Sequence, residues 1–162
     1  DLSFRAGGAS DKNTHVNVCV EINANDTIAD NFWVWRADHG KGVGWEVNRA
    51  DNGLIVNGDN VYAYCMMVEH FQEYQTIWRG NSGYLAFYQS ECPYDAPTFS
   101  DWSSEEGKFG YASYKVDDSV TSHYAVALGV YSHNKYVDEM IESGLETPER
   151  NGVIIQNAFI EK

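Results

Sequence analysis

Five segments of the chain each open with a polar residue and run directly into a stretch rich in β-branched and aromatic residues. The segments begin at Asp26, Asp59, Asn81, Asp118 and Asn151, so successive starts lie 33, 22, 37 and 33 residues apart. A turn of roughly 22 residues, lengthened in places by insertions of about 11 to 15 residues, explains this unequal spacing. The repeat therefore indicates a stack of similar units, and no other feature constrains the fold as strongly.

Each unit consists of short strands separated by tight turns. The stretch GLIVNGDNVYAYCMMV contains two such strands, which meet at the turn formed by Asn57 and Gly58. We expect a helical turn at residues 137–143 and a solvated loop at residues 101–108, DWSSEEGK. The pattern predicts an all-β fold, a right-handed parallel β-helix of about five coils with loop insertions. An antiparallel sandwich is the alternative, but its turn signals would recur every ~8 to 12 residues.

Length and charge narrow the classes of protein and partner. With 162 residues the chain fits one domain, which we expect to span residues 1–162. The net charge of −13 would repel a phosphate backbone, so we expect neither nucleic acid nor an anionic membrane as a partner. Aromatic residues make up 14% of the chain. Because flat aromatic faces stack on rings, this excess favours sugar binding.

The three cysteines leave their own pairing open. Cys19, Cys65 and Cys92 allow at most one internal disulfide with one free thiol, or three free thiols. Their spacing lacks the paired arrangement of a zinc site, so we predict no metal site.

Three long blocks of the sequence carry a family resemblance: WVWRADHGKGVGWEVNRADNGLIVNGDNVYAY, VEHFQEYQTIWRGNSGYLAFYQSECPYD and GYASYKVDDSVTSHYAVALGVYSH. They resemble secreted microbial proteins with the pectate-lyase-like β-helix fold, whose bacterial members are often labelled as coagulation factor 5/8-type (discoidin-domain) proteins. These proteins are related to glucan-active glycoside hydrolases. The resemblance implies an extracellular, carbohydrate-active protein, a glycoside hydrolase acting on a neutral polysaccharide such as a glucan.

Members of that family differ from this chain in two ways. They are usually longer, with coils that precede the segment corresponding to Asp1, so the resemblance implies that this chain corresponds to the C-terminal part of a longer helix. Where this chain has Cys92, before the sequence PYD, relatives tend to have methionine.

A column of charged residues is predicted from the repeat. Arg36, Glu69 and Glu91 each lie ten residues after a segment start, and equal offsets in a β-helix stack about 4.8 Å apart. Carboxylates on neighbouring coils suit retaining glycoside hydrolysis at about 5 to 5.5 Å, and a two-coil separation suits inversion at about 6.5 to 9.5 Å. Crowding also raises one pKa and so supplies a protonated acid. The alternative is a structural ion pair between Arg36 and Glu69.

The stretch FWVWRADHGKGVGW supplies a third candidate carboxylate. Asp38 could be a general acid or nucleophile with His39 as its partner, or it could cap backbone N–H groups at a corner. Strict alternation places Trp33 and Trp35 on one side of a strand, where core packing is favoured. Trp45, beyond the glycine-rich turn, is the better platform for stacking on a sugar ring.

The remaining candidates are polar groups that could hold a sugar. Together with Arg36, His39 and Trp45, the predicted substrate-binding residues are His70, Gln89, Tyr94, Asp95 and Lys115. Lys115 also keeps open a polysaccharide lyase, which would need a basic residue and Ca²⁺. Otherwise we expect no cofactor. A further hypothesis is a non-catalytic polysaccharide-binding or structural β-helix, which self-assembles into homo-oligomers through open helix ends.

Overall fold

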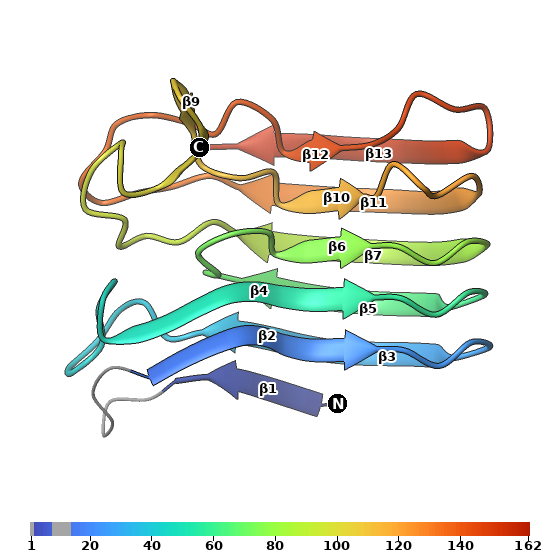
Figure 1. Ribbon diagram of the computed structural model, residues 1–162, viewed down its shortest axis with the longest axis horizontal. Helices are drawn as coiled ribbons and strands as arrows, with labels where there is room; N and C mark the ends of the chain where they lie inside the picture. Colours follow the sequence, from blue (N-terminus) through green and yellow to red (C-terminus); the bar gives the residue numbers. More distant parts are fainter. Residues whose placement is uncertain (1, 8–13) are drawn as a thin grey trace.

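The structure is a computed structural model that describes residues 2–7 and 14–162. Two parallel sheets make up most of it (Figure 1). The six-stranded sheet contains, in order, β1 (Leu2–Ala6), β3 (Ile28–Arg36), β5 (Tyr62–Glu69), β7 (Gly83–Glu91), β11 (His123–Tyr131) and β13 (Val153–Glu161). The five-stranded sheet contains, in order, β12 (Leu145–Glu146), β10 (Tyr114–Val116), β6 (Thr76–Trp78), β4 (Asn48–Val56) and β2 (Thr14–Ile22).

Successive strands of the chain alternate between the two sheets. An antiparallel hairpin, β8 (Ser103–Glu105) and β9 (Lys108–Phe109), interrupts this order between β7 and β10. Each return to a sheet adds one strand beside the previous one, so the strands rise in sequence order from β1 to β13 (Figure 1). The prediction of an all-β fold with parallel strands is therefore confirmed.

Residues 137–143 do not form the expected helical turn, because over residues 2–7 and 14–162 the structure has no helix. Ile141 is 2% exposed, and its backbone N–H donates to the Ser132 hydroxyl at 3.1 Å. Burial of this single apolar side chain fixes the segment as an irregular loop. For the same part of the chain, no helix could span a membrane.

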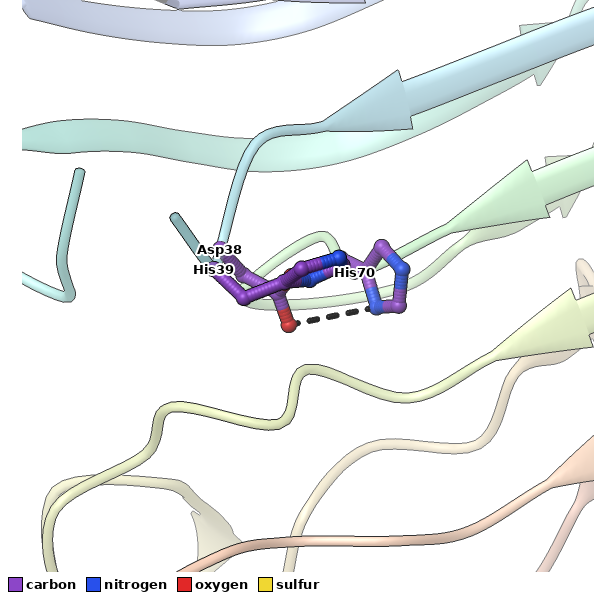
Figure 2. Close-up of side chains that lie close together, drawn as sticks. All are labelled: Asp38, His39 and His70. Atoms are coloured by element: carbon purple, nitrogen blue, oxygen red, sulfur yellow. Dashed lines mark hydrogen bonds and ion pairs between the residues drawn. The ribbon is translucent and has the colours of Figure 1, made fainter. Parts of the chain in front are cut away.

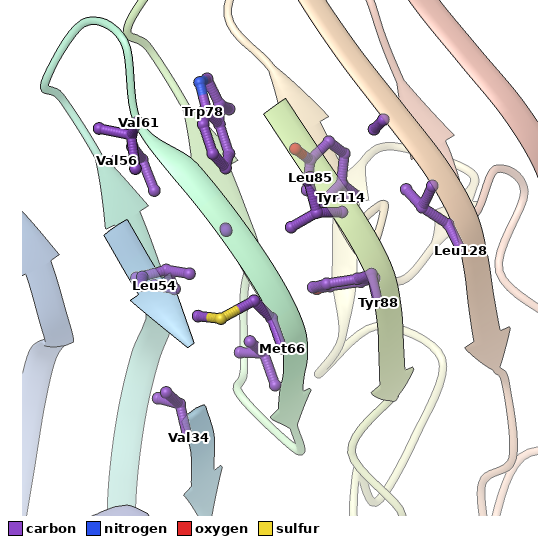
Figure 3. Close-up of a cluster of buried hydrophobic side chains, with 14 of the residues drawn as sticks. Val34, Leu54, Val56, Val61, Met66, Trp78, Leu85, Tyr88, Tyr114 and Leu128 are labelled. Atoms are coloured by element: carbon purple, nitrogen blue, oxygen red, sulfur yellow. The ribbon is translucent and has the colours of Figure 1, made fainter. Parts of the chain in front are cut away.

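The main core lies between the two sheets (Figure 3). Val34, Met66 and Leu85 project inward from the six-stranded sheet, and Leu54 and Trp78 meet them from the other side. Each of these side chains is at most 1% exposed. In the central strands β5, β7 and β11 the inward positions are buried, and they alternate with outward positions on either side of one irregular position.

A second apolar cluster lies beneath the β8–β9 hairpin. It contains Cys92, Trp102 and Phe109, and Trp102 is 1% exposed with its indole N–H donating to the carbonyl of Gln72 at 3.0 Å. The expectation of a wholly solvated loop at residues 101–108 is wrong, since Trp102 anchors this segment and Ser103 to Phe109 pair as strands. All three cysteines of the chain are free.

Polar side chains at one corner form a ladder that sets the register of the strands. The Asn25 side chain accepts from the backbone N–H of Asp59 at 2.8 Å, Asp59 accepts from Asn81 at 2.6 Å, and Asn81 accepts from Thr121 at 2.8 Å. The first repeating unit therefore begins at Asn25 and not at Asp26, and the fourth begins at Thr121 and not at Asp118. A slip of one residue reverses the face to which every side chain of a strand points.

A left-handed residue kinks each of five strands at the same level of the six-stranded sheet. These residues have φ between 52° and 63° and occupy matching positions of β3, β5, β7, β11 and β13: Asn31, Cys65, Phe87, Ala127 and Asn157. Two consecutive side chains then point outward, so strict alternation fails at this level. Side chains that follow the left-handed residue therefore point to the face opposite to the one that uninterrupted alternation would predict.

Candidate active site

The carboxyl-terminal ends of β3, β5, β7 and β11 place four side chains in one outward-facing column. Trp35 is the register partner of Glu69, Glu69 of Glu91, and Glu91 of Tyr131. Neighbouring parallel strands lie about 4.8 Å apart, so Glu69 and Glu91 stand side by side. The structure therefore brings together two of the predicted carboxylates from segments that are 22 residues apart in the sequence.

Arg36 is not part of this column, and its predicted place is wrong. The column contains Trp35 instead, because the repeat is aligned from Asn25. Arg36 points inward and is fully buried, and its guanidinium donates to both oxygens of Asp95, at 3.0 and 2.8 Å. The alternative of an ion pair between Arg36 and Glu69 is therefore wrong as well.

Two tryptophans flank the carboxylates on the outer face. Trp33 and Trp35 stack with ring centroids 5.1 Å apart and 10° between their planes, and Trp33 is 42% exposed. The Trp33 indole N–H donates to Glu69 at 2.8 Å. The expected core packing of these two rings is wrong, because the kink at Asn31 turns both outward. The exposed Trp33 ring, supported by Trp35 and beside a carboxylate, can receive the flat face of a sugar ring.

Glu69 is the carboxylate whose environment most favours the protonated form. Burial raises the pKa of Glu69, the hydrogen bond from Trp33 lowers it, and the nearby charge of Glu91 raises it further. Crowding by a second carboxylate thus adds to the effect of burial on Glu69. A protonated carboxylic acid beside a carboxylate is the arrangement that acid/base catalysis needs.

Glu91 is held by hydrogen bonds from two nearby side chains. The Tyr94 hydroxyl donates to one carboxylate oxygen of Glu91, and the Gln89 amide donates to the other at 3.1 Å. Burial, followed by the hydrogen bond and charge of Glu91, raises the pKa of Tyr94, so its phenol stays protonated and remains a donor. These contacts leave the Glu91 side chain 26% exposed, within reach of a ligand on the outer face.

Asp38, His39 and His70 form a polar group (Figure 2). The Asp38 carboxylate is fully buried and lies 2.6 Å from Nδ1 of His39 and 3.2 Å from Nδ1 of His70. It also accepts from the backbone N–H of Tyr94 at 2.8 Å. Nε2 of His70 is 3.8 Å from Glu91. Asp38 therefore fixes the positions of His70 and Tyr94, both of which face Glu91.

The same three residues have the chemistry of a metal site. One ligand atom from each of Asp38, His39 and His70 lies within 4.8 Å of the others. Hydrogen bonds account for the same arrangement without a metal. One Asp38 oxygen is hydrogen-bonded to His39, and the other accepts from the backbone N–H of Tyr94. The prediction that the chain uses no metal stays a prediction.

Most predicted site residues gather at this end of the six-stranded sheet, but two lie elsewhere. Those brought together are Asp38, Glu69, Glu91, His39, His70, Gln89, Tyr94 and Asp95, with Arg36 buried behind them. The Arg36 guanidinium lies over the ring of Trp45, 5.5 Å from the ring centroid. Trp45 faces a different hollow, which Gln72 also lines. Lys115 lies on β10 of the five-stranded sheet and pairs with Glu146 at 3.2 Å. The structure thus does not bring Lys115 to the carboxylates, as a lyase base would require.

Two aromatic residues of this region were not predicted from the sequence. Tyr131 continues the column beside Glu91, and His133 lies 5.3 Å from the Tyr94 ring in an edge-on arrangement. Both belong to the segment LGVYSH, whose alignment with YQSECP of the preceding repeat would have placed Tyr131 beside Glu91.

Comparison with known proteins gives one family and two curated relatives. The chain matches the LAM55 pectate lyase-like domain over residues 1–91. It is 47% identical over 161 residues to a protein from Streptomyces sp. (strain SirexAA-E / ActE) named exo-beta-1,3-glucanase, which covers 99% of this chain and 26% of the relative. It is 32% identical over 94 residues to a glucan 1,3-beta-glucosidase of Cochliobolus carbonum, over 52% of this chain and 11% of the relative.

Two solved structures of one protein share the fold. The structure of sacteLam55A from Streptomyces sp. SirexAA-E superposes with a TM-score of 0.84 and 42% identity, covering 98% of this chain and 30% of that one. A variant of sacteLam55A in complex with glucose superposes with a TM-score of 0.83 and 39% identity, with the same coverage. The chain therefore spans less than a third of the length of these relatives.

Proposed function

The chain belongs to the LAM55 pectate lyase-like domain family, and from this premise we propose that it forms the catalytic part of a glycoside hydrolase acting on a neutral β-1,3-glucan. One observation carries the proposal: Glu69 and Glu91 stand side by side on the outer face, next to the exposed Trp33, which stacks on the half-buried Trp35. The names of two relatives, an exo-beta-1,3-glucanase and a glucan 1,3-beta-glucosidase, support the class of substrate.

Hydrolysis would use Glu69 and Glu91 as an acid/base pair. One carboxyl group donates its proton to the glycosidic oxygen as the bond to the sugar C1 carbon breaks, and the other carboxylate takes a proton from the water that adds to C1. Tyr94 and Gln89 hold Glu91 in position, and burial favours the protonated form of Glu69. We assign Asp38 a positioning role, because its side chain is fully buried, is hydrogen-bonded to His39 and to the backbone N–H of Tyr94, and lies 3.2 Å from Nδ1 of His70.

We further propose that the two parallel sheets form a right-handed parallel β-helix of about five coils. The strand order supports this proposal, since every second strand returns to the same sheet beside its predecessor. Parallel crossovers are right-handed in about 98% of cases.

An extracellular location and a reaction without cofactor complete the proposal. A net charge of −13 suits a neutral polysaccharide better than a polyanion, because a polyanion would be repelled. Lys115 is already paired with Glu146, which argues against a lyase that removes a proton with this residue.

The test is the release of reducing ends from a panel of neutral glucans. We expect activity on β-1,3-glucan, and a loss of about 10²- to 10⁴-fold in Glu91→Gln and Glu69→Gln, because each variant removes one member of the acid/base pair. Glu149→Gln, at an exposed position outside the site, is the matched control and should retain full activity. Unchanged activity in both pair variants would refute the proposed chemistry. Binding without any hydrolysis would favour the non-catalytic alternative.

A further inference from the structure

A well-formed hollow lies on the five-stranded sheet and not at the carboxylate pair. Its volume is about 420 Å³, within the range of about 300 to 1,000 Å³ that is typical of ligand sites. Strand β10, the β8–β9 hairpin and residues 142–146 enclose it. The core separates this sheet from Glu69 and Glu91, so the hollow is a second feature of the molecule.

The charges around this hollow are already balanced in pairs. Lys115 lies 3.2 Å from Glu146, and Lys108 lies 3.2 Å from Glu105. Glu142 adds one more carboxylate to the lining. Two ammonium groups and three carboxylates leave a net charge of −1, which does not favour an anion. The paired carboxylates are likewise not free to bind a cation, so a neutral ligand suits the hollow better.

Two tyrosines form an aromatic corner in the wall. The rings of Tyr74 and Tyr111 meet edge to face, with centroids 5.3 Å apart and 80° between their planes. Two hydrogen bonds hold the Tyr74 hydroxyl in place: it accepts from the Lys115 ammonium at 3.1 Å and donates to Glu146 at 3.3 Å. The Lys115 ammonium also lies 4.7 Å from the centre of the Tyr74 ring. These contacts hold the corner rigid before any ligand arrives.

Tyr111 also borders a neighbouring hollow. That hollow has a volume of about 330 Å³, and Trp45 and Gln72 line it together with one cation, Arg49, and the four carboxylates of Glu46, Asp51, Glu73 and Asp101, an excess of negative charge that also disfavours an anion. Because one ring belongs to both walls, an elongated ligand could lie across Tyr111 and occupy both hollows. The polar groups on either side offer donors and acceptors together, as a ligand with many hydroxyl groups requires.

We propose that these two hollows form a second binding site for a neutral β-glucan chain, with Tyr111 as the central stacking platform. The site would hold the polysaccharide away from the carboxylate pair and keep long chains near the protein. The identity of the sugar rests on the proposed function, whereas the position and neutrality of the ligand rest on the contacts above.

The test uses two variants of one residue. Tyr111→Ala removes the aromatic ring, and Tyr111→Phe keeps it while removing only the hydroxyl group. An NMR titration of the Glu91→Gln protein with a β-1,3-linked gluco-oligosaccharide should shift the backbone signals of Tyr111, Lys115 and Glu142. We expect Tyr111→Ala to weaken this binding about tenfold, as loss of a stacked ring does, and Tyr111→Phe to bind normally.

Activity separates this inference from the proposed function. With Glu91 intact, Tyr111→Ala should hydrolyse long glucan less efficiently and short oligosaccharides at the normal rate. Binding at Tyr111 in a protein that hydrolyses no glucan would uphold the second site and refute the proposed function. Hydrolysis with no signal shift at Tyr111, or equal binding by Tyr111→Ala and Tyr111→Phe, would overturn the second site. Tighter binding of a sulfated glycan would overturn the neutrality of the ligand.

Discussion

Replacing Asp95 with asparagine tests the structural basis of the candidate site. Arg36 is 0% exposed, and its guanidinium donates to both carboxylate oxygens of Asp95 and to backbone carbonyls of Asn48 and His70. This ion pair links the residue after Trp35 to the residue after Tyr94. Asp95→Asn keeps the shape of the side chain but leaves the buried guanidinium without an opposite charge.

The size of the effect follows from burial. Removing one partner of a buried ion pair costs about 3 to 5 kcal/mol, because the remaining charge is uncompensated. Asparagine still offers one oxygen to Arg36, so we expect a loss near the lower end, about 3 kcal/mol in the free energy of unfolding. In a protein of this size, that loss lowers the melting temperature by about 6 to 12 °C.

Urea unfolding followed by circular dichroism measures this free energy. Asp118→Asn, at an exposed carboxylate, is the matched control and should change it by less than about 0.5 kcal/mol. A loss below about 1 kcal/mol in Asp95→Asn would refute the reasoning. It would mean that the guanidinium is solvated or compensated by the surrounding carbonyl groups.

Three further predictions concern stability. Because the pKa of Glu69 is raised in the folded state, its contribution to stability is present at acidic pH and is lost as pH rises through that pKa. The free energy of unfolding of Glu69→Gln, measured in urea, should therefore equal or exceed that of the wild type at pH 7, and the difference should narrow toward pH 4. Burial lowers the pKa of His123 to about 4, so stability should fall by up to about 3 kcal/mol as pH drops from about 6.5 to 4, and His123→Gln should remove this part of the slope. A Cβ at Gly80 would lie 1.8 Å from the carbonyl oxygen of Gly58, so Gly80→Ala should lower the melting temperature by several degrees, whereas Gly107→Ala, where the space is open, should cost only the strain of its positive φ.

The repeat made the parallel all-β fold predictable, and it also brought Glu69 next to Glu91. Both inferences depend on equal offsets within the units, which survive insertions between them. Arg36 was misplaced because two adjacent polar residues, Asn25 and Asp26, could each begin the first unit. The choice between them depends on which side chain accepts from the backbone N–H of Asp59, where the next segment begins. That contact is formed only in three dimensions.

The outward position of the tryptophans could not be predicted by alternation. It depends on left-handed backbone at Asn31, and the same conformation recurs on the neighbouring strands at Cys65 and Phe87, residue types that are not usual at positive φ. Stacking of successive strands imposes this conformation, so it is a tertiary effect. The contacts of Asp38 with His70 and Tyr94 likewise join residues that are far apart in the sequence, and so does the pairing of Lys115 with Glu146.

The position of a bound sugar is the most direct test of the central claim, that Glu69 and Glu91 form the reaction centre. The measurement is a crystal structure of Glu91→Gln with a β-1,3-linked gluco-oligosaccharide. The account predicts a sugar ring against the Trp33 and Trp35 pair, with a glycosidic oxygen within hydrogen-bond distance of residue 69 or 91. An oligosaccharide bound elsewhere, with the outer face of β3, β5 and β7 left free, would contradict it.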